Sequence, residues 1–194
     1  MDETAEQSKI VTADEWADAR AQLQQREDAF LSEHASLNDA RQNFAMTPFD
    51  GRYVFQASDH DPTLLELFDG HRQLIVYHFW FQPGDDETCP GRTMWTDTLG
   101  DLTPLAEHDT TLVFVSRAPI DQIETAKTQH GWTIPWYSLA NESFNEAVGY
   151  ADIAQLSVFT HRADPVYLTY TTNTGRDLET ITSHWSLLAR TPTG

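Results

Sequence analysis

The first apolar pattern along the chain is a row of large residues with heptad spacing in a segment that lacks Gly and Pro. Thr12 and Glu15 have the spacing of a helix-capping box, and no Gly or Pro occurs between residues 12 and 46. Every seventh residue is large and apolar, and we call these five the heptad row: Trp16, Leu23, Phe30, Leu37 and Phe44. One apolar position per heptad is typical of a helix that lies across another surface. We expect a long helix, either unbroken or broken between residues 32 and 38.

Residues 48–51 interrupt this pattern, and shorter apolar runs follow. The run at residues 73–81 is apolar or aromatic at almost every position, which predicts a central strand of a mostly parallel sheet. Further strands are predicted at residues 111–115, 156–160 and 166–171. Helices are predicted to begin at Cys89 and Pro119 and to cover residues 141–148 and 177–189.

The order of these elements indicates the fold class. Strand–helix–strand units require parallel pairing with right-handed crossovers, and a terminal hairpin adds antiparallel strands to the same sheet. We predict an α/β, thioredoxin-like fold, with a mixed central sheet flanked by helices. Residues 1–47 form the helical extension and residues 48–194 the thioredoxin-like domain. A flavodoxin-like sheet is the alternative, but the chain has no Gly-x-Gly-x-x-Gly or Walker motif for phosphate.

The charge balance restricts the expected partners. The 194 residues include 30 Asp and Glu against 12 Lys and Arg, for a formal net charge of −18, and the lysines are Lys9 and Lys127 alone. Such a surface repels phosphate, so we expect neither nucleic acid nor an anionic membrane as a partner. Scarce lysine and abundant carboxylates favour a halophilic protein, because molar salt screens the self-repulsion.

The distribution of apolar residues indicates a cytoplasmic location. No apolar run approaches the ~20 residues of a membrane-spanning helix. The first ten residues are acidic and lack the apolar core of a secretory signal. We therefore expect a cytoplasmic protein.

The single cysteine, Cys89, is the first candidate for chemistry, and it excludes an internal disulfide and a cysteine-rich zinc site. Cys89 stands at a predicted helix start, where unpaired N–H groups and the helix dipole favour the thiolate. Arg92 follows one turn later and Arg117 follows the next strand, so both are candidates to stabilise this thiolate. The other interpretation of Cys89 is a small hydrophobe with an unused thiol.

Other residue types near the strand ends suggest a pocket. The candidate pocket residues are Trp80, Asp86, Trp95 and Trp136, although tryptophans more often pack in the core. His78 lies inside an apolar strand, where a core histidine with hydrogen-bond partners is expected. The histidines show no metal-ligand spacing such as His-Glu-x-x-His, so we expect no metal and no cofactor.

Several short motifs resemble one prokaryotic family, domain-of-unknown-function family 899, which is described as thioredoxin-like. In order, they are Ile10-Val11, Asp69-Gly70, LIVYHFWF at 74–81, Cys89-Pro90-Gly91, VSRAP at 115–119, Gly131-Trp132, Pro135-Trp136, LSVF at 156–159 and Thr191-Pro192. The resemblance covers residues 10–192 and implies a thioredoxin-like fold. The middle of the chain is also similar to peroxiredoxins in layout, with a cysteine at a helix start between two core strands.

The chain departs from these families at three positions. Many members of the family carry Cys-Pro-x-Cys, where this chain has Arg92 in place of the second cysteine. Thioredoxins have a cis-proline before the third core strand, where this chain reads AQLS at 154–157. Peroxiredoxins have a proline six residues and a threonine three residues before the reactive cysteine. Pro83 matches the proline, but Asp86 replaces the threonine.

Two functional classes follow. The first is a thiol-dependent oxidoreductase of the one-cysteine, peroxidase-like kind, in which Cys89 attacks, Arg92 or Arg117 stabilises the thiolate, and an external thiol or redox protein restores it. The second is a non-catalytic thioredoxin-fold protein that binds a ligand or partner without dithiol chemistry. The heptad row also predicts a homodimer in which the N-terminal helix contacts the second chain. The alternative is a helix that bends between residues 32 and 38 and packs entirely on its own domain.

Overall fold

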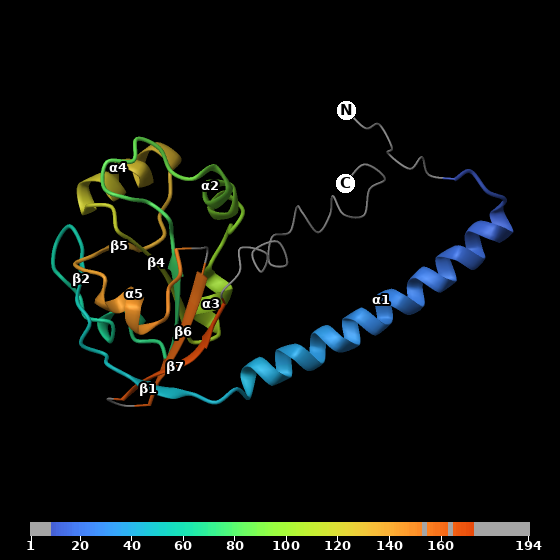
Figure 1. Ribbon diagram of the computed structural model, residues 1–194, viewed down its shortest axis with the longest axis horizontal. Coiled ribbons are helices and arrows are strands. Elements are labelled where there is room, and N and C mark those ends of the chain that lie inside the picture. The colour runs from blue at the N-terminus through green and yellow to red at the C-terminus, as the bar shows by residue number, and fades with distance from the viewer. Residues whose placement is uncertain (1–8, 153–154, 163–164, 173–194) are drawn as a thin grey trace. The chain divides into compact units, whose positions relative to one another are not determined.

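A computed structural model describes residues 9–152, 155–162 and 165–172, which belong to two units (Figure 1). The N-terminal helix belongs to one unit, and the sheet belongs to the other, which begins at Ala45. The helix predicted at residues 177–189 lies outside the described residues. Among the helices that are described, none is long and apolar enough to cross a membrane.

Helix α1 spans Ala13–Gln42 without a break, which decides between the two sequence-based alternatives. The predicted capping box is present, because the Thr12 side chain accepts from the Glu15 N–H at 3.3 Å and the Glu15 carboxylate accepts from the Thr12 N–H at 2.9 Å. Polar side chains one turn apart are joined along the helix, as in the bond of 2.7 Å from Arg20 to Gln24. No residue of α1 is buried, and the five residues of the heptad row are 46–66% exposed.

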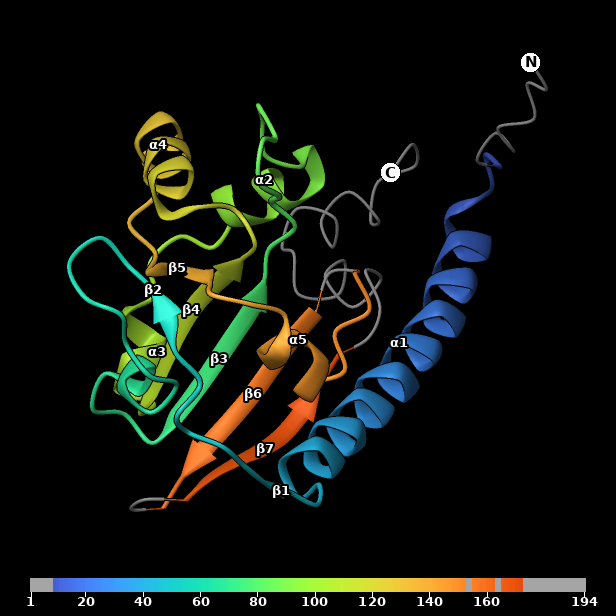
Figure 2. The same ribbon diagram turned by 60° about the vertical axis from the view of Figure 1, so that its left-hand side comes forward.

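The second unit is built on a mixed sheet, which within the described residues has the strand order β1-β7-β6-β3-β4-β5-β2 (Figure 2). The strands are β1 (Thr47–Phe49), β2 (Phe55–Gln56), β3 (Gln73–His78), β4 (Thr110–Ser116), β5 (Trp136–Leu139), β6 (Gln155–His161) and β7 (Val166–Thr171). Strands β3, β4 and β5 pair in parallel, whereas the other neighbours are antiparallel. The predicted parallel core and terminal hairpin are therefore present, but the expectation of a mostly parallel sheet was wrong, because four of the six strand pairings in the described residues are antiparallel.

Two strands differ from the sequence expectation. Strand β3 ends at His78, although the chain stays beside β4 beyond this point, since the Phe79 N–H donates to the Val115 carbonyl at 2.9 Å. Residues 47–49 form β1 instead of an interruption. Pro48 lacks an N–H and is tolerated because β1 is an edge strand, which among the described residues pairs with β7 alone.

Five helical segments connect the strands of this unit within the described residues. They are η1 (Glu66–Phe68), α2 (Pro90–Asp97), α3 (Thr103–Glu107), α4 (Ile120–His130) and α5 (Ser143–Ala147). The starts of α2 and α4 agree with the sequence prediction, whereas α3 was not expected. Helix α4 ends at Gly131, whose φ of 70° is the left-handed conformation that glycine adopts most readily.

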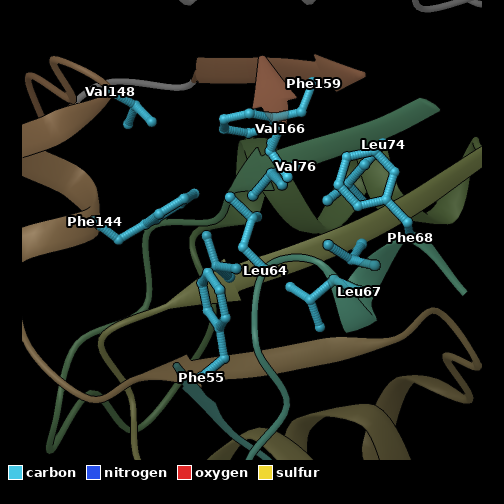
Figure 3. Packing of buried hydrophobic residues seen from close by; sticks show 12 residues of the cluster. Phe55, Leu64, Leu67, Phe68, Leu74, Val76, Phe144, Val148, Phe159 and Val166 are labelled. Atoms are coloured by element: carbon cyan, nitrogen blue, oxygen red, sulfur yellow. The ribbon is translucent and has the colours of Figure 1, made fainter. Parts of the chain in front are cut away.

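Hydrophobic clusters cover both faces of the sheet, and Figure 1 shows α5 and α2 on opposite sides of the strands. The cluster under α5 contains Phe144, Val76 and Phe159 (Figure 3). The cluster under α2 and α4 contains ten buried residues: Tyr77, Phe79, Phe81, Trp95, Leu112, Phe114, Ala118, Ile123, Ala126 and Trp136. Successive residues of a strand face opposite sides, so Val76 and Tyr77 enter different clusters.

Candidate functional site: the Cys89 cavity

Cys89 is the N-cap residue of helix α2, at the end of the loop that follows β3. Pro90 occupies the first helical position, where its missing N–H costs no hydrogen bond. The backbone at Cys89 is fixed from inside the helix, because the N–H and the hydroxyl of Thr93 both donate to the Cys89 carbonyl, at 2.9 and 3.1 Å. The cysteine itself is half-buried and lines an open cavity.

The surroundings of the sulfur favour the thiolate over the thiol. Desolvation by burial is the largest single influence on the pKa of Cys89, and it raises this pKa. The backbone N–H and side chain of Arg92 and the backbone N–H of Gly91 act in the opposite direction and outweigh it. The pKa of Cys89 therefore lies below its ordinary value, as expected for a cysteine at a helix N-terminus beside an arginine.

Arg92 is held between the sulfur and an indole ring. Its guanidinium carbon lies 6.0 Å from the ring centroid of Trp80, within range of a cation–π contact. Its Nε atom is buried and has no hydrogen-bond partner among the described residues. Arg92 therefore presents a desolvated N–H donor next to Cys89.

Tyr77 approaches the same place from the sheet. The residue is 0% exposed, and its ring packs on Trp95 of α2 with centroids 4.4 Å apart. Burial raises the pKa of Tyr77, and Arg92 and Cys89 act on this pKa in opposite directions, so both lie close to the phenol. Arg92 nevertheless forms no hydrogen bond of acceptable geometry with the hydroxyl, which has no partner within the described part of the chain.

An open cavity of about 530 Å³ lies over these groups. It is lined by Trp80, Asp85, Glu87, Thr88, Cys89, Pro90, Arg92 and Asp152. Among these residues there are three carboxylates and one cation, Arg92. We call Asp85, Glu87 and Asp152 the acidic rim.

A second cavity, of about 700 Å³, lies between α2, α4 and the 85–88 loop. It shares Asp85, Glu87 and Thr88 with the first cavity but does not include Cys89. Although this cavity is larger, we place the candidate site in the first one, because Cys89 lines that cavity.

Arg117 is bound to carboxylates. Its Nε and Nη2 donate to the two oxygens of Glu142 at 2.6 and 2.7 Å, and its Nη1 donates to Asp152 at 2.6 Å. Hydrogen bonds from Arg117 to Glu142 are the largest cause of a raised pKa of the guanidinium. Its guanidinium carbon also lies 5.6 Å from the ring centroid of Tyr150. Arg117 is thus connected to the Cys89 cavity through Asp152, to which it donates and which lines that cavity.

His78 is a buried histidine with both ring nitrogens partnered, as the sequence predicts. Its Nδ1 lies 3.1 Å from the side-chain oxygen of Asn145, and its Nε2 lies 2.9 Å from the Ser157 hydroxyl. Burial lowers the pKa of His78 to about 4, so the ring is neutral at pH 7. The Asn145 amide donates in turn to Glu142 at 3.2 Å, which joins the buried histidine to the carboxylate that holds Arg117.

Residues 5–194 match the family model described as a bacterial protein of unknown function (DUF899). The chain belongs to this family. No protein of curated function matches the chain significantly. The family is thus the one that the sequence motifs resemble.

Solved structures similar to this DUF899 protein include peroxiredoxins. A mutant of Xanthomonas campestris peroxiredoxin Q has a TM-score of 0.54 at 14% identity, covering 77% of this chain and 99% of that chain. A mutant of Xylella fastidiosa PrxQ has a TM-score of 0.51 at 15% identity, covering 76% and 98%. A Xanthomonas campestris bacterioferritin comigratory protein, described for its alkyl peroxide reduction activity, has a TM-score of 0.51 at 14% identity, covering 76% and 100%. At these identities the likeness establishes the thioredoxin-like fold, which confirms the predicted fold class.

The structure brings together only some of the residues that the sequence singled out. Cys89, Arg92 and Trp80 meet in one cavity, whereas Asp86 lines the neighbouring one. Trp95 and Trp136 are 4% and 3% exposed and lie in the cluster under α2 and α4.

Sequence reasoning also missed groups that take part in the site. Tyr77 was not singled out, because an apolar run does not indicate that the hydroxyl of one of its residues lacks a hydrogen-bond partner among the described residues. Asp152 was missed because nothing in the sequence connects it with Arg117, 35 residues earlier. Among the described residues, no group of three or more His, Cys, Asp or Glu side chains is arranged to hold a metal ion.

Proposed function

We propose that this DUF899 protein is a thiol-dependent oxidoreductase in which Cys89 is the reacting group. The observation that carries the proposal is the position of Cys89 at the start of α2, where Arg92 and two backbone N–H groups lower the pKa of the thiol. A lowered pKa raises the thiolate fraction at neutral pH, and the thiolate is the nucleophilic form. The open cavity above the sulfur gives a small oxidant access to it.

The proposed reaction is a one-cysteine peroxidase cycle. The Cys89 thiolate attacks one oxygen of a hydroperoxide, so that an S–O bond forms and the O–O bond breaks. The sulfur is oxidised to sulfenic acid, and the remaining oxygen takes a proton from water and leaves as an alcohol or as water. An external thiol then displaces water from the sulfenic acid to give a mixed disulfide, and a second thiol restores Cys89 while leaving as the disulfide.

Two further observations support this reaction class. The chain has one cysteine, so a reductant from outside must complete the cycle. One structure of the same fold belongs to a protein described for alkyl peroxide reduction, although the 14% identity makes this a likeness of fold. The partner of Cys89 is therefore proposed to be a small thiol or the thiol of a redox protein.

Turnover of hydrogen peroxide in the presence of an external thiol tests this function. We expect the protein to consume peroxide with dithiothreitol as reductant faster than dithiothreitol alone, and we expect Cys89→Ser to lose this acceleration. Ser143→Ala, on the exposed start of α5, serves as a matched single-residue control that keeps the acceleration. Equal rates for the wild type and Cys89→Ser would show that the cysteine performs no peroxidase turnover.

The second candidate function is ligand binding without redox chemistry, and one observation favours it. The larger cavity, of about 700 Å³, lies beside α4 and excludes Cys89. A protein with this function would show no difference between the wild type and Cys89→Ser in the peroxide assay. The same assay therefore separates the two functions.

A further inference from the structure

Two buried hydrogen-bond donors lie beside Cys89 without an acceptor in the described part of the chain. They are the hydroxyl of Tyr77 and the Nε of Arg92. An unpaired buried polar group lowers the stability of the fold, so such groups are few in native proteins and concentrate where function requires them. The two donors come from different elements, since Tyr77 belongs to β3 and Arg92 to α2. Arg92 lowers the pKa of Cys89, and the charge of Cys89 raises the pKa of Tyr77, so both residues lie close to the sulfur.

The chemistry of the pair defines what it can bind. Arginine only donates, and the Tyr77 hydroxyl stays protonated at neutral pH because burial raises its pKa, so it has an O–H to donate as well as lone pairs that accept. The N–H groups of Gly91 and Arg92 at the start of α2 add further donors next to the sulfur. These N–H and O–H donors together fit an oxygen atom, in particular one on which negative charge develops.

The acidic rim limits which oxygen compounds reach this position. Asp85, Glu87 and Asp152 line the cavity, and the one cation among the lining residues is Arg92, which lies beside Trp80 and acts on the sulfur. The charge of Arg117 is balanced by Glu142 and Asp152. An anionic oxidant therefore meets repulsion from the acidic rim, while an uncharged one does not.

We propose that Tyr77 and Arg92 form an oxygen-binding subsite beside Cys89, which the acidic rim restricts to uncharged hydroperoxides. This inference rests on the proposed function and names the substrate class of the same site. In the attack on the hydroperoxide, negative charge develops on the leaving oxygen as the O–O bond breaks. The two donors stabilise this charge until water supplies the proton, and neither donor is itself consumed.

The first arm of the test removes one donor. Tyr77→Phe deletes the hydroxyl alone, and Tyr53→Phe is the matched control in the cluster on the other face of the sheet. We expect the second-order rate of Cys89 sulfenic acid formation by hydrogen peroxide to fall by about 10- to 100-fold in Tyr77→Phe, the range for a lost hydrogen bond to a charged group. The rate should stay unchanged in Tyr53→Phe.

Alkylation by iodoacetamide separates a subsite from an effect on the thiolate, because it reports the nucleophilicity of the sulfur. We expect the alkylation rate of Tyr77→Phe to equal that of the wild type. The melting temperature should hold or rise, since the variant removes an unpaired buried hydroxyl. If Tyr77→Phe does not fold, Arg92→Lys removes the other donor while keeping the charge, and the oxidation rate is expected to fall more than the alkylation rate.

The second arm tests the charge of the oxidant. Rates with hydrogen peroxide and with the peroxymonosulfate anion are each divided by the rate for free cysteine. For the wild type at low salt, we expect the acceleration over free cysteine to be smaller with peroxymonosulfate than with hydrogen peroxide, so that the anion-to-peroxide ratio of the two accelerations is below one. Added KCl should raise this ratio. Glu87→Gln should raise the ratio about five-fold, from a Coulomb energy of ~1 kcal/mol in water, whereas the matched control Glu107→Gln should leave it unchanged.

The outcomes test separately the proposed function, the oxygen-binding subsite and the restriction to uncharged oxidants. A wild-type rate with hydrogen peroxide no faster than free cysteine would contradict the proposed function itself. A fast wild type with an equally fast Tyr77→Phe would leave that function standing and overturn the subsite. A loss of both oxidation and alkylation in Tyr77→Phe would also overturn it, because Tyr77 would then act on the thiolate. An anion-to-peroxide ratio of one or more would overturn the restriction to uncharged oxidants.

Discussion

Arg117 donates to Asp152 at 2.6 Å, and Asp152 also lines the cavity that contains Cys89. The two arginines that the sequence assigned to the thiolate therefore have different roles in the structure. Arg92 acts on the sulfur directly, whereas the charge of Arg117 is balanced by two carboxylates. This difference leads to a prediction that separates them.

We predict that Arg92→Gln raises the pKa of Cys89 and that Arg117→Gln changes it far less. The reason is that Arg92 supplies a hydrogen bond and a positive charge to the thiolate, whereas the charge of Arg117 is balanced by Glu142 and Asp152. The measurement is the pH dependence of iodoacetamide alkylation, which follows the thiolate fraction. Equal shifts in the two variants would mean that both arginines reach the sulfur in solution.

His78 should make the stability of the protein depend on pH. The pKa of His78 is lowered from 6.5 to about 4 by burial, so the folded state binds fewer protons than the unfolded state between these values. The stability that comes from the neutral ring is fully present above pH 6.5 and is lost as the pH falls towards 4. Between pH 7 and 5 the free energy of unfolding should decrease by about 2 kcal/mol from this group.

Urea denaturation in molar KCl measures this decrease, because the salt screens the change in net charge over the same pH range. His78→Gln, which offers similar polar atoms, should lose most of the pH dependence. A histidine-ring NMR signal of His78 that titrates between pH 6 and 7 would contradict the account of a desolvated, neutral ring.

Salt should stabilise the folded protein. At a formal net charge of −18, like charges are closer together on the folded surface than in the expanded chain, and molar KCl shortens the screening length to ~3 Å. We predict that the melting temperature rises substantially between dilute buffer and molar KCl. A melting temperature that stays constant over this range would remove the halophilic interpretation.

The heptad row should hold two chains together. Its residues are exposed along α1, and large apolar side chains exposed in a row usually mark an interface. An isologous contact between two copies of the helix would cover them, so we predict a homodimer in molar salt. Light scattering should give a dimer for the intact chain and a monomer for Phe30→Glu, with Glu33→Gln on the same helix as the control that stays dimeric. A monomeric intact chain would exclude the dimer, and a dimeric Phe30→Glu would exclude this row as its interface.

The sequence was sufficient where local chemistry decides the structure. The apolar run around Val76 predicted a buried strand, and Cys89 followed by Pro90 has the form of a helix start. Thr12 and Glu15 marked the beginning of α1 by reciprocal capping. In each of these places neighbours within a few residues supply the interactions, so a pattern in the sequence carries the information.

The sequence was insufficient where partners are distant. Arg117 has its partners 25 and 35 residues away, and no local pattern indicates that their carboxylates, not the thiolate, would bind it. Tyr77 reads as one more apolar residue in its strand. Only the packing of β3 under α2 shows that its hydroxyl ends beside Cys89 and Arg92 without a partner.

The central claim, a reactive Cys89 in a donor-lined cavity, is tested most directly by its rate of oxidation. The measurement is the second-order rate constant for sulfenic acid formation by hydrogen peroxide at neutral pH in molar KCl, followed by mass spectrometry of the dimedone adduct. We predict a rate constant well above that of free cysteine under the same conditions, because the thiolate fraction is raised and the leaving oxygen is stabilised. A rate constant equal to or below that of free cysteine would contradict the account.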